Sequence, residues 1–164
     1  VKPYRQKVAH CGPAALKMVL EYYGISRSES DLARFSGCRE SHGTSARGIL
    51  RAASRCGLEG YIKDDSSLSD IRRLVHKEKL PPIVDWFSVD DGHYSVVMDI
   101  DGRNIYLQDP ELGHARAMRL DVFRRVWFDF PSAYMRRRED VILRRLIALR
   151  QKVTSVQPRF KKPT

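Results

Sequence analysis

Residues 6–24 read QKVAHCGPAALKMVLEYYG and place a cysteine at the start of a predicted helix. Pro13 suits the first turn of a helix, because its missing N–H group loses no hydrogen bond there. Apolar residues then recur at helical spacing up to Gly24, a residue type that commonly ends a helix. The free N–H groups and the dipole at a helix start favour the thiolate form of a cysteine. The segment therefore predicts a nucleophile at Cys11, and the alternative is a buried structural cysteine.

A cysteine nucleophile needs a base that takes its proton and a third group that orients the base. His93 opens one predicted strand and Asp109 closes the next, in a hairpin that turns near residues 101–103. A three-residue loop would pair Ser95 with Asp109 and place His93 on the same face, whereas a two-residue loop would place the two on opposite faces. The alternatives are a hydrogen-bonded structural histidine and an aspartate that serves a turn before proline. The spacing permits a Cys-His-Asp triad without requiring it.

Acyl transfer also needs hydrogen-bond donors for the oxyanion that forms on the substrate. The backbone N–H of Cys11 lies at the helix start, and Gln6 can supply a side-chain amide from five residues upstream. The alternative for Gln6 is an ordinary exposed side chain. These two residues complete the set that could carry out chemistry at this helix start.

The cysteines and histidines give no metal-binding pattern. Three cysteines and five histidines occur without C-x-x-C or H-x-x-x-H spacing, so we expect no metal ion and no cofactor. An odd number of cysteines indicates a reducing compartment, with a bridge between Cys38 and Cys56 left open. No acid lies at a useful sequence spacing from the four histidines His10, His42, His76 and His114.

The apolar pattern beyond the first helix predicts helices first and strands second. The length of 164 residues suits one domain with a real core, and no apolar run approaches the ~18 residues that span a bilayer. Helices are predicted over 28–36, 44–57, 67–76 and 120–128, and strands over 58–63, 83–87, 93–100, 104–108 and 115–119. This order predicts an α+β fold, in which a helical N-terminal half packs on an antiparallel sheet.

The net charge of +10 lies mostly in the C-terminal segment, since residues 135–164 carry +8 of it. The nearly neutral body, residues 1–134, argues against nucleic-acid binding, which needs a basic patch on the folded domain. Apolar and basic residues over 139–150 predict a basic amphipathic helix, followed by disorder over 158–164. This helix either contacts an anionic membrane surface or a partner, or docks on its own domain. We therefore expect a domain at 1–134 and a separate tail.

The sequence resembles the bacteriocin-processing cysteine peptidases in five motifs that occur in the same order. They are Gln6, CGPA at 11–14, GTSARGILRAASRCGL at 43–58, GHY at 92–94 and DP at 109–110. These enzymes form the double-glycine-leader peptidase domain, often found at the N-terminus of peptide-exporting ABC transporters. The resemblance runs from about residue 3 to about residue 130 and implies a papain-like fold.

The resemblance implies a role for each matching residue. Cys11, His93 and Asp109 would form the catalytic triad, and Gln6 would complete the oxyanion hole. The narrow groove for small substrate residues would have its walls at Gly43, Thr44, Ser45 and Gly92, although Gly43 could serve only the turn before its helix. The chain departs from the family at His10, where an acidic residue usually precedes the cysteine. This departure alters the charge beside the site without removing any triad position.

The implied function is a cysteine endopeptidase that cuts leader peptides after a small-residue pair of the Gly-Gly type. Its implied partners are a leader-bearing peptide and an ABC transporter or membrane surface contacted through the basic tail, at the cytoplasmic face of the membrane. Two alternatives remain: a module that binds a leader peptide without cutting it, and a papain-like acyltransferase that uses the same triad. The transporter's own domains are not represented, since no G-x-x-x-x-G-K-[ST] motif occurs.

Overall fold

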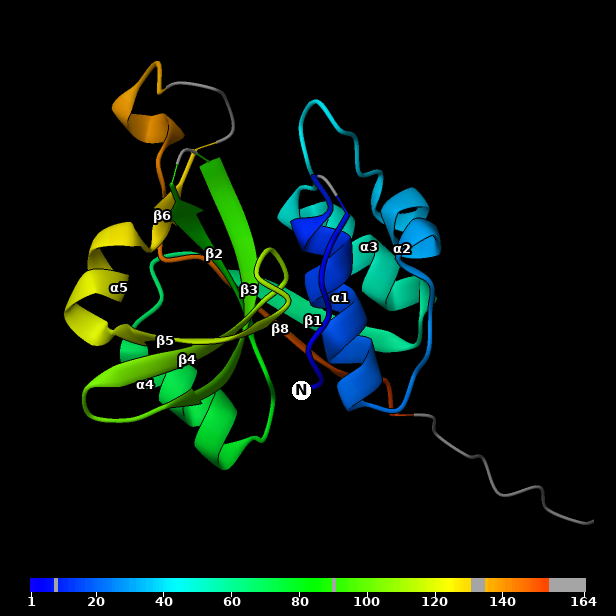
Figure 1. Cartoon of the computed structure of the whole chain (residues 1–164), viewed down its shortest axis with the longest axis horizontal. Helices are drawn as coiled ribbons and strands as arrows, with labels where there is room; N and C mark the ends of the chain where they lie inside the picture. The colour runs from blue at the N-terminus through cyan, green and yellow to red at the C-terminus, as the bar shows by residue number, and fades with distance from the viewer. Residues whose placement is uncertain (8, 90, 131–134, 154–164) are drawn as a thin grey trace, which may run out of the picture.

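The structure is a computed structural model that describes residues 1–7, 9–89, 91–130 and 135–153. Three N-terminal helices gather on one side of an antiparallel sheet, and shorter helices cover its other side (Figure 1). The helices are α1 (Cys11–Tyr22), α2 (Glu29–Ser36), α3 (Ala46–Arg55), α4 (Leu68–Arg72), the π-helical turn η1 (Arg73–Lys77), α5 (Leu120–Val126) and the 3-10 turn η2 (Arg138–Asp140). The α+β prediction is confirmed.

The strands form one large sheet and one short ribbon. They are β1 (Leu58–Lys63), β2 (Ile83–Ser88), β3 (Asp91–Ile100), β4 (Asn104–Asp109), β5 (His114–Arg119), β6 (Phe128–Asp129), β7 (Ile142–Leu143) and β8 (Leu146–Gln151). The large sheet has the order β1-β8-β2-β3-β4-β5, and each neighbouring pair is antiparallel. The ribbon pairs β6 with β7.

The helix starts follow the capping residues that the sequence offers. Ser28 and Ser45 accept hydrogen bonds from the N–H groups of Asp31 and Gly48, so each caps its helix as predicted. Ser67 and Asp70 form a reciprocal capping box at the start of α4. These local signals explain why the helix positions could be predicted closely. Among the described residues, none of the helices is both long and apolar enough to cross a membrane.

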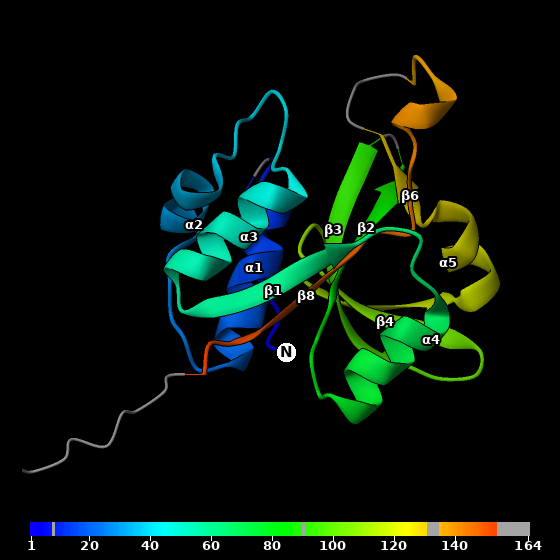
Figure 2. The ribbon, with the colours of Figure 1, turned by 180° about the vertical axis from the view of Figure 1, so that it is seen from behind.

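The predicted helix over 139–150 is wrong. Residues 146–151 form β8, which lies between β1 and β2 and connects them (Figure 2). Of the apolar residues that suggested one face of a helix (Ile142, Leu143, Leu146 and Leu149), Leu146 and Leu149 are at most 1% exposed in the sheet, whereas Ile142 and Leu143 form the separate strand β7. The domain boundary predicted after residue 134 is therefore wrong too, because the sheet needs this strand. The predicted disorder over 158–164 lies outside the described residues.

Two apolar clusters pack on opposite faces of the sheet. One joins α1, α2 and α3 to the sheet and includes Leu16, Ile49 and Ile147. The other lies beneath α4 and α5 and includes Trp86 and Phe123. The sheet thus connects the helical half to the rest, and α1 contacts β3 directly.

The β3–β4 hairpin reaches the predicted register near the site by a different route. Val96 pairs with Gln108, so the next residues in register are Ser95 and Asp109. This is the register predicted for a three-residue loop. The strands actually pair Ile100 with Ile105, so neither the three-residue loop nor the two-residue loop considered in the sequence forms. A β-bulge between Val97 and Asp99 adds one residue to β3, so His93 and Asp109 still lie on the same face of the sheet.

Candidate active site

Cys11 is the first residue of α1, and its side chain is half-buried. The N–H group of Ala14 donates to the carbonyl of His10 at 2.9 Å, which is the first hydrogen bond of the helix. The N–H groups of Cys11 and Gly12 precede this bond and are therefore free of helix partners. A thiolate at Cys11, or an oxyanion beside it, would face these donors and the positive end of the helix dipole.

His93 and Asp109 meet directly. The Nε2 atom of His93 lies 2.7 Å from Oδ1 of Asp109, and both side chains are buried. Burial alone would lower the pKa of His93, but hydrogen bonds with Asp109 and Cys11, and their charges, raise it to about 9. The imidazole is consequently protonated at neutral pH. Asp109 holds one ring nitrogen of His93, so the other ring nitrogen is available to hydrogen-bond with Cys11.

Asp109 stays ionised despite its burial. Burial would raise the pKa of Asp109, yet hydrogen bonds from His93 and Arg116, with their positive charges, hold it below its usual range. The backbone N–H of Glu111 also donates to Oδ1 of Asp109 at 3.0 Å. The carboxylate can therefore fix the tautomer and orientation of His93, as the third member of a triad must.

A cleft of about 360 Å³ opens beside these residues. Its lining includes Gln6, Cys11, Gly92, His93 and Glu111. Gln6 is tied to the Asp109 loop, since its backbone N–H donates to the carbonyl of Pro110 at 2.8 Å. The side-chain oxygen of Gln6 is buried and makes no hydrogen bond within the described part of the chain. Because Gln6 lines the cleft, the NH2 group of its side chain is close enough to donate to an oxyanion there.

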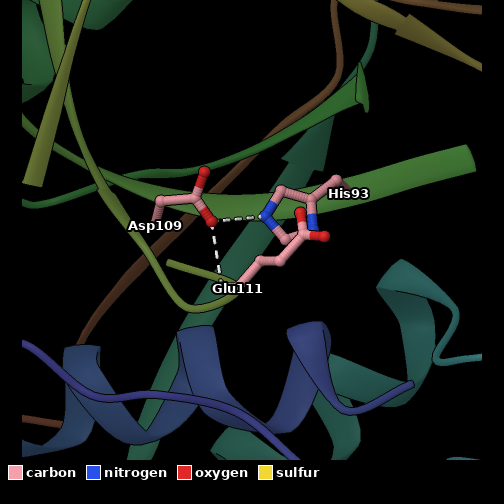
Figure 3. A group of neighbouring side chains, drawn as sticks. All are labelled: His93, Asp109 and Glu111. Carbon is pink, nitrogen blue, oxygen red and sulfur yellow. Dashed lines mark hydrogen bonds and ion pairs between the residues drawn. The ribbon is translucent and has the colours of Figure 1, made fainter. Parts of the chain in front are cut away.

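Glu111 adds a carboxylate to the cleft rim beside His93 and Asp109 (Figure 3). One ligand-type atom from each of the three residues lies within 4.8 Å of the others. A metal ion would need the neutral form of His93. The protonated ring already engaged by Asp109 favours proton transfer over metal binding, so we interpret the cluster as part of a proton-transfer site.

Comparison with known proteins identifies the family. The model of the peptidase C39 family matches residues 3–130. The chain belongs to the peptidase C39 family. An uncharacterized protein of Methanothermobacter marburgensis is 38% identical over 117 residues, which cover 71% of this chain and 75% of that protein. The lactococcin-G-processing and transport ATP-binding protein LagD of Lactococcus lactis is 28% identical over 133 residues, 76% of this chain and 17% of LagD.

Solved structures show the same fold. The peptidase domain of Streptococcus ComA, a bifunctional ABC transporter, superposes with a TM-score of 0.72 at 24% identity, covering 92% of this chain and 98% of that one. A double-glycine-motif protease from an AMS/PCAT transporter, solved in complex with its leader peptide, gives a TM-score of 0.71 at 20% identity, with 93% and 91% coverage. The likeness to these peptidase domains therefore extends over nearly the whole chain.

The residues predicted as groove walls lie in different places. Gly92 lines the cleft, whereas Gly43, Thr44 and Ser45 lie outside its lining. Gly43 adopts a left-handed φ of 61° in its turn, and Ser45 caps α3. Thr44 is buried against Gly12, where an added Cβ would lie 2.8 Å from the Thr44 Cβ. Thr44 therefore packs against the helix start that carries Cys11, whereas Gly43 and Ser45 serve the turn and the start of α3.

A buried glutamate near the site was missed in the sequence. Glu29, which is 4% exposed, accepts hydrogen bonds from the Tyr4 hydroxyl at 2.6 Å and the Lys7 N–H at 3.0 Å. It also lies 2.7 Å from Nδ1 of His10, the residue before Cys11. Burial opposes ionisation of Glu29, but these bonds lower its pKa. His10 and His76, for which the sequence offered no acid at a useful spacing, both have an acidic partner in the fold, since His76 contacts Asp99 at 2.9 Å.

A second buried acid lies behind the cleft. Asp85 on β2 is 2% exposed, and burial together with the neighbouring Asp129 carboxylate raises its pKa well above the usual value. Asp129 closes against Gly92, where an added Cβ would lie 2.3 Å from Oδ1 of Asp129. A larger residue before His93 would therefore force the Asp129 side chain to move.

The remaining cysteines form no bridge. Cys38 and Cys56 are free, so the disulfide left open by the sequence is absent. The Cys38 thiol donates to the carbonyl of Ala9 at 3.5 Å, and burial raises the pKa of Cys38. Because a thiol with a raised pKa is a poor nucleophile at neutral pH, Cys38 does not compete with Cys11 for the chemistry.

Proposed function

We propose that the chain is a cysteine endopeptidase that cleaves a leader peptide after a small-residue pair of the Gly-Gly type. The observation that carries the proposal is the hydrogen-bonded His93–Asp109 pair, which meets Cys11 at the start of α1 in one cleft. Membership of the C39 family and likeness to proteins that process lactococcins support a peptide substrate. An ABC transporter is the proposed partner, and the cytoplasmic side of the membrane the proposed place.

The chemistry follows from the charges. The Cys11 thiolate attacks the carbonyl carbon of the second residue of the small-residue pair, and the peptide C–N bond that follows breaks as protonated His93 gives its proton to the leaving amine. The backbone N–H of Cys11 and the amide of Gln6 hold the oxyanion of the tetrahedral intermediate. Neutral His93 then takes a proton from water, which hydrolyses the acyl-enzyme and releases Cys11.

The proposal is tested with Cys11→Ala and its matched control Cys38→Ala. Cys11→Ala is expected to abolish cleavage of a Gly-Gly leader peptide, and Cys38→Ala to retain it. A peptide with Val-Val in place of Gly-Gly should be cut at least about a hundredfold more slowly, because the proposed specificity admits only small side chains before the scissile bond. Full activity of Cys11→Ala would refute the mechanism, and indifference to Val-Val would remove the double-glycine assignment.

Two further measurements separate the alternatives. Tight binding of the leader peptide without turnover, under reducing conditions, would favour a binding module over a peptidase. A competing amine that appears in the product would favour acyl transfer over hydrolysis. The endopeptidase proposal expects free carboxylate as the product and turnover in the presence of the reductant.

A further inference from the structure

Arg116 on β5 contacts the proposed triad without belonging to it. Its Nη1 atom donates to Oδ2 of Asp109 at 3.2 Å, and its side chain is about one third exposed. Leu107 pairs with Arg116 and Asp109 pairs with His114, so Arg116 lies diagonally opposite Asp109 on the same face. The register of the β4–β5 pair therefore delivers a guanidinium to the carboxylate.

The two oxygens of Asp109 have separate donors. Oδ1 accepts hydrogen bonds from the His93 ring and from the backbone N–H of Glu111, whereas Oδ2 accepts a hydrogen bond from Arg116. Asp109 is 0% exposed, so water cannot replace a missing donor without opening the fold. Arg116 therefore controls how the carboxylate is turned toward His93, since rotation of the group would move both oxygens.

Arg116 is also stacked. Its guanidinium lies 5.3 Å from the centre of the Trp86 ring, on the strand beyond His93. Trp86 in turn lies edge-on to the His93 ring at 5.6 Å, and its Nε1 donates to Ser95 Oγ at 3.0 Å. Stacking on Trp86 fixes the guanidinium plane, and Trp86 forms one wall beside the His93 ring. The assembly crosses four adjacent strands, from β2 to β5.

We propose that Arg116 is a positioning residue that, through its hydrogen bond to Asp109 and its stacking on Trp86, holds the Asp109–His93 pair in register for Cys11. This inference rests on the proposed cysteine chemistry but goes beyond it, because it assigns a role to a side chain outside the triad and the oxyanion hole.

The charges that face Asp109 set the expected direction of a pH effect. They are His93 on β3, Arg116 on β5 and Glu111 in the following loop, with Cys11 on α1 reached through His93. Removing the positive charge of Arg116 disfavours every nearby anion and favours every nearby cation. Both the acidic and the basic limb of the pH profile of Cys11 reactivity should therefore move to higher pH.

The test compares Arg116→Met with Arg116→Lys, and uses Arg119→Met as a matched control. Arg119 lies on the same strand, and its side chain pairs with the exposed Asp121 at 3.0 Å. It does not line the cleft. The rate of iodoacetamide alkylation of Cys11, read by mass spectrometry, is measured against pH alongside kcat and KM for peptide cleavage. Alkylation reports thiolate formation even if no peptide is cut, so failure of this inference and failure of the proposed function are distinguishable.

Arg116→Met should shift the acidic limb of alkylation upward by about half a pH unit. It should also lower kcat roughly tenfold with little change in KM, because misplacing the base slows the chemical step. Arg116→Lys should recover most of the pH shift, because it keeps the charge, but only part of the loss in kcat, because it cannot stack a planar group on Trp86, and Arg119→Met should show neither effect. An unchanged pH profile in Arg116→Met, or the same shift in Arg119→Met, overturns the proposal. If Arg116→Met does not fold, Arg116→Gln takes its place. It is compared with Arg116→Lys by the same measurements, and the same outcomes decide.

Discussion

At the scale of single residues, the raised pKa of His93 links the site to stability. Burial opposes protonation of His93, but Asp109 and Cys11 raise its pKa to about 9 from 6.5. A group whose pKa is higher in the folded state stabilises fully below its unfolded pKa and loses that effect as pH rises through the folded value. The contribution amounts to about 3 kcal/mol at most.

The free energy of unfolding should therefore fall between about pH 6.5 and pH 9 in the wild-type chain, and His93→Gln should flatten this fall. Urea unfolding at several pH values measures both slopes. His76→Gln is the matched control, because His76 also contacts an aspartate but is exposed. Equal slopes in the wild-type chain and His93→Gln would contradict the linkage.

Glu29 offers a second prediction at this scale. Glu29→Gln keeps the size but leaves only one acceptor oxygen for the Tyr4 hydroxyl, the Lys7 N–H and His10. We expect a loss of about 1–3 kcal/mol in the free energy of unfolding, because buried donors lose their partner. Cleavage activity should fall together with stability, since the segment that Glu29 holds through Tyr4 and Lys7 also carries Gln6. The exposed Glu59→Gln, which loses an ion pair with Arg150, should cost less than about 1 kcal/mol.

At the scale of elements, β8 decides whether the C-terminal segment can be removed. Truncation after residue 134 deletes a strand that pairs with both β1 and β2 and leaves two open edges. The shortened protein should aggregate or lose its folded near-UV circular dichroism signal. Truncation after Lys152 keeps β8 and should leave the melting temperature nearly unchanged. A folded and active protein ending at residue 134 would show that β8 is dispensable.

The sequence revealed the elements whose signals are local. Serine caps, a proline in the first turn and alternating strands marked α1, α2, α3, β3 and β4 closely. β8 was misread because Ile142, Leu143, Leu146 and Leu149 recur at helical spacing, and because a short apolar run such as 146–149 fits a buried strand as well as a buried helix segment. Its partners in β1 lie more than eighty residues earlier, so nothing nearby identifies a strand.

The residues of the candidate site also fall into two groups, those with local sequence signals and those without. Cys11, His93 and Asp109 could be proposed from short motifs and hairpin spacing, although the bulge beside Met98 that sets their common face has no sequence signature. Arg116 could not be found, because its bond to Asp109 depends on a strand register that no local pattern fixes. The pair of His10 with Glu29 joins residues nineteen positions apart and was likewise invisible.

At the scale of the whole molecule, the last described strand joins the two halves. Ile147 pairs with Ile62 on β1 and with Ile83 on β2, so β8 connects the helical half to the sheet half. The cleft lies where these halves meet, with Cys11 on α1 and His93 on β3. Neither half should therefore hold its native structure without the other, and the active geometry should exist only in the fully folded chain.

We expect a single cooperative unfolding transition. Fluorescence of Trp86 and Trp127 reports the sheet half, because both pack in the apolar cluster beneath α4 and α5, while far-UV circular dichroism is dominated by the long N-terminal helices. The two signals should give coincident curves in urea. Ile147→Ala should move both curves together by about 2–4 kcal/mol, since it empties a fully buried position between the halves. Separated curves in the wild-type chain would show that the helical half and the sheet half unfold independently, and that β8 does not couple them.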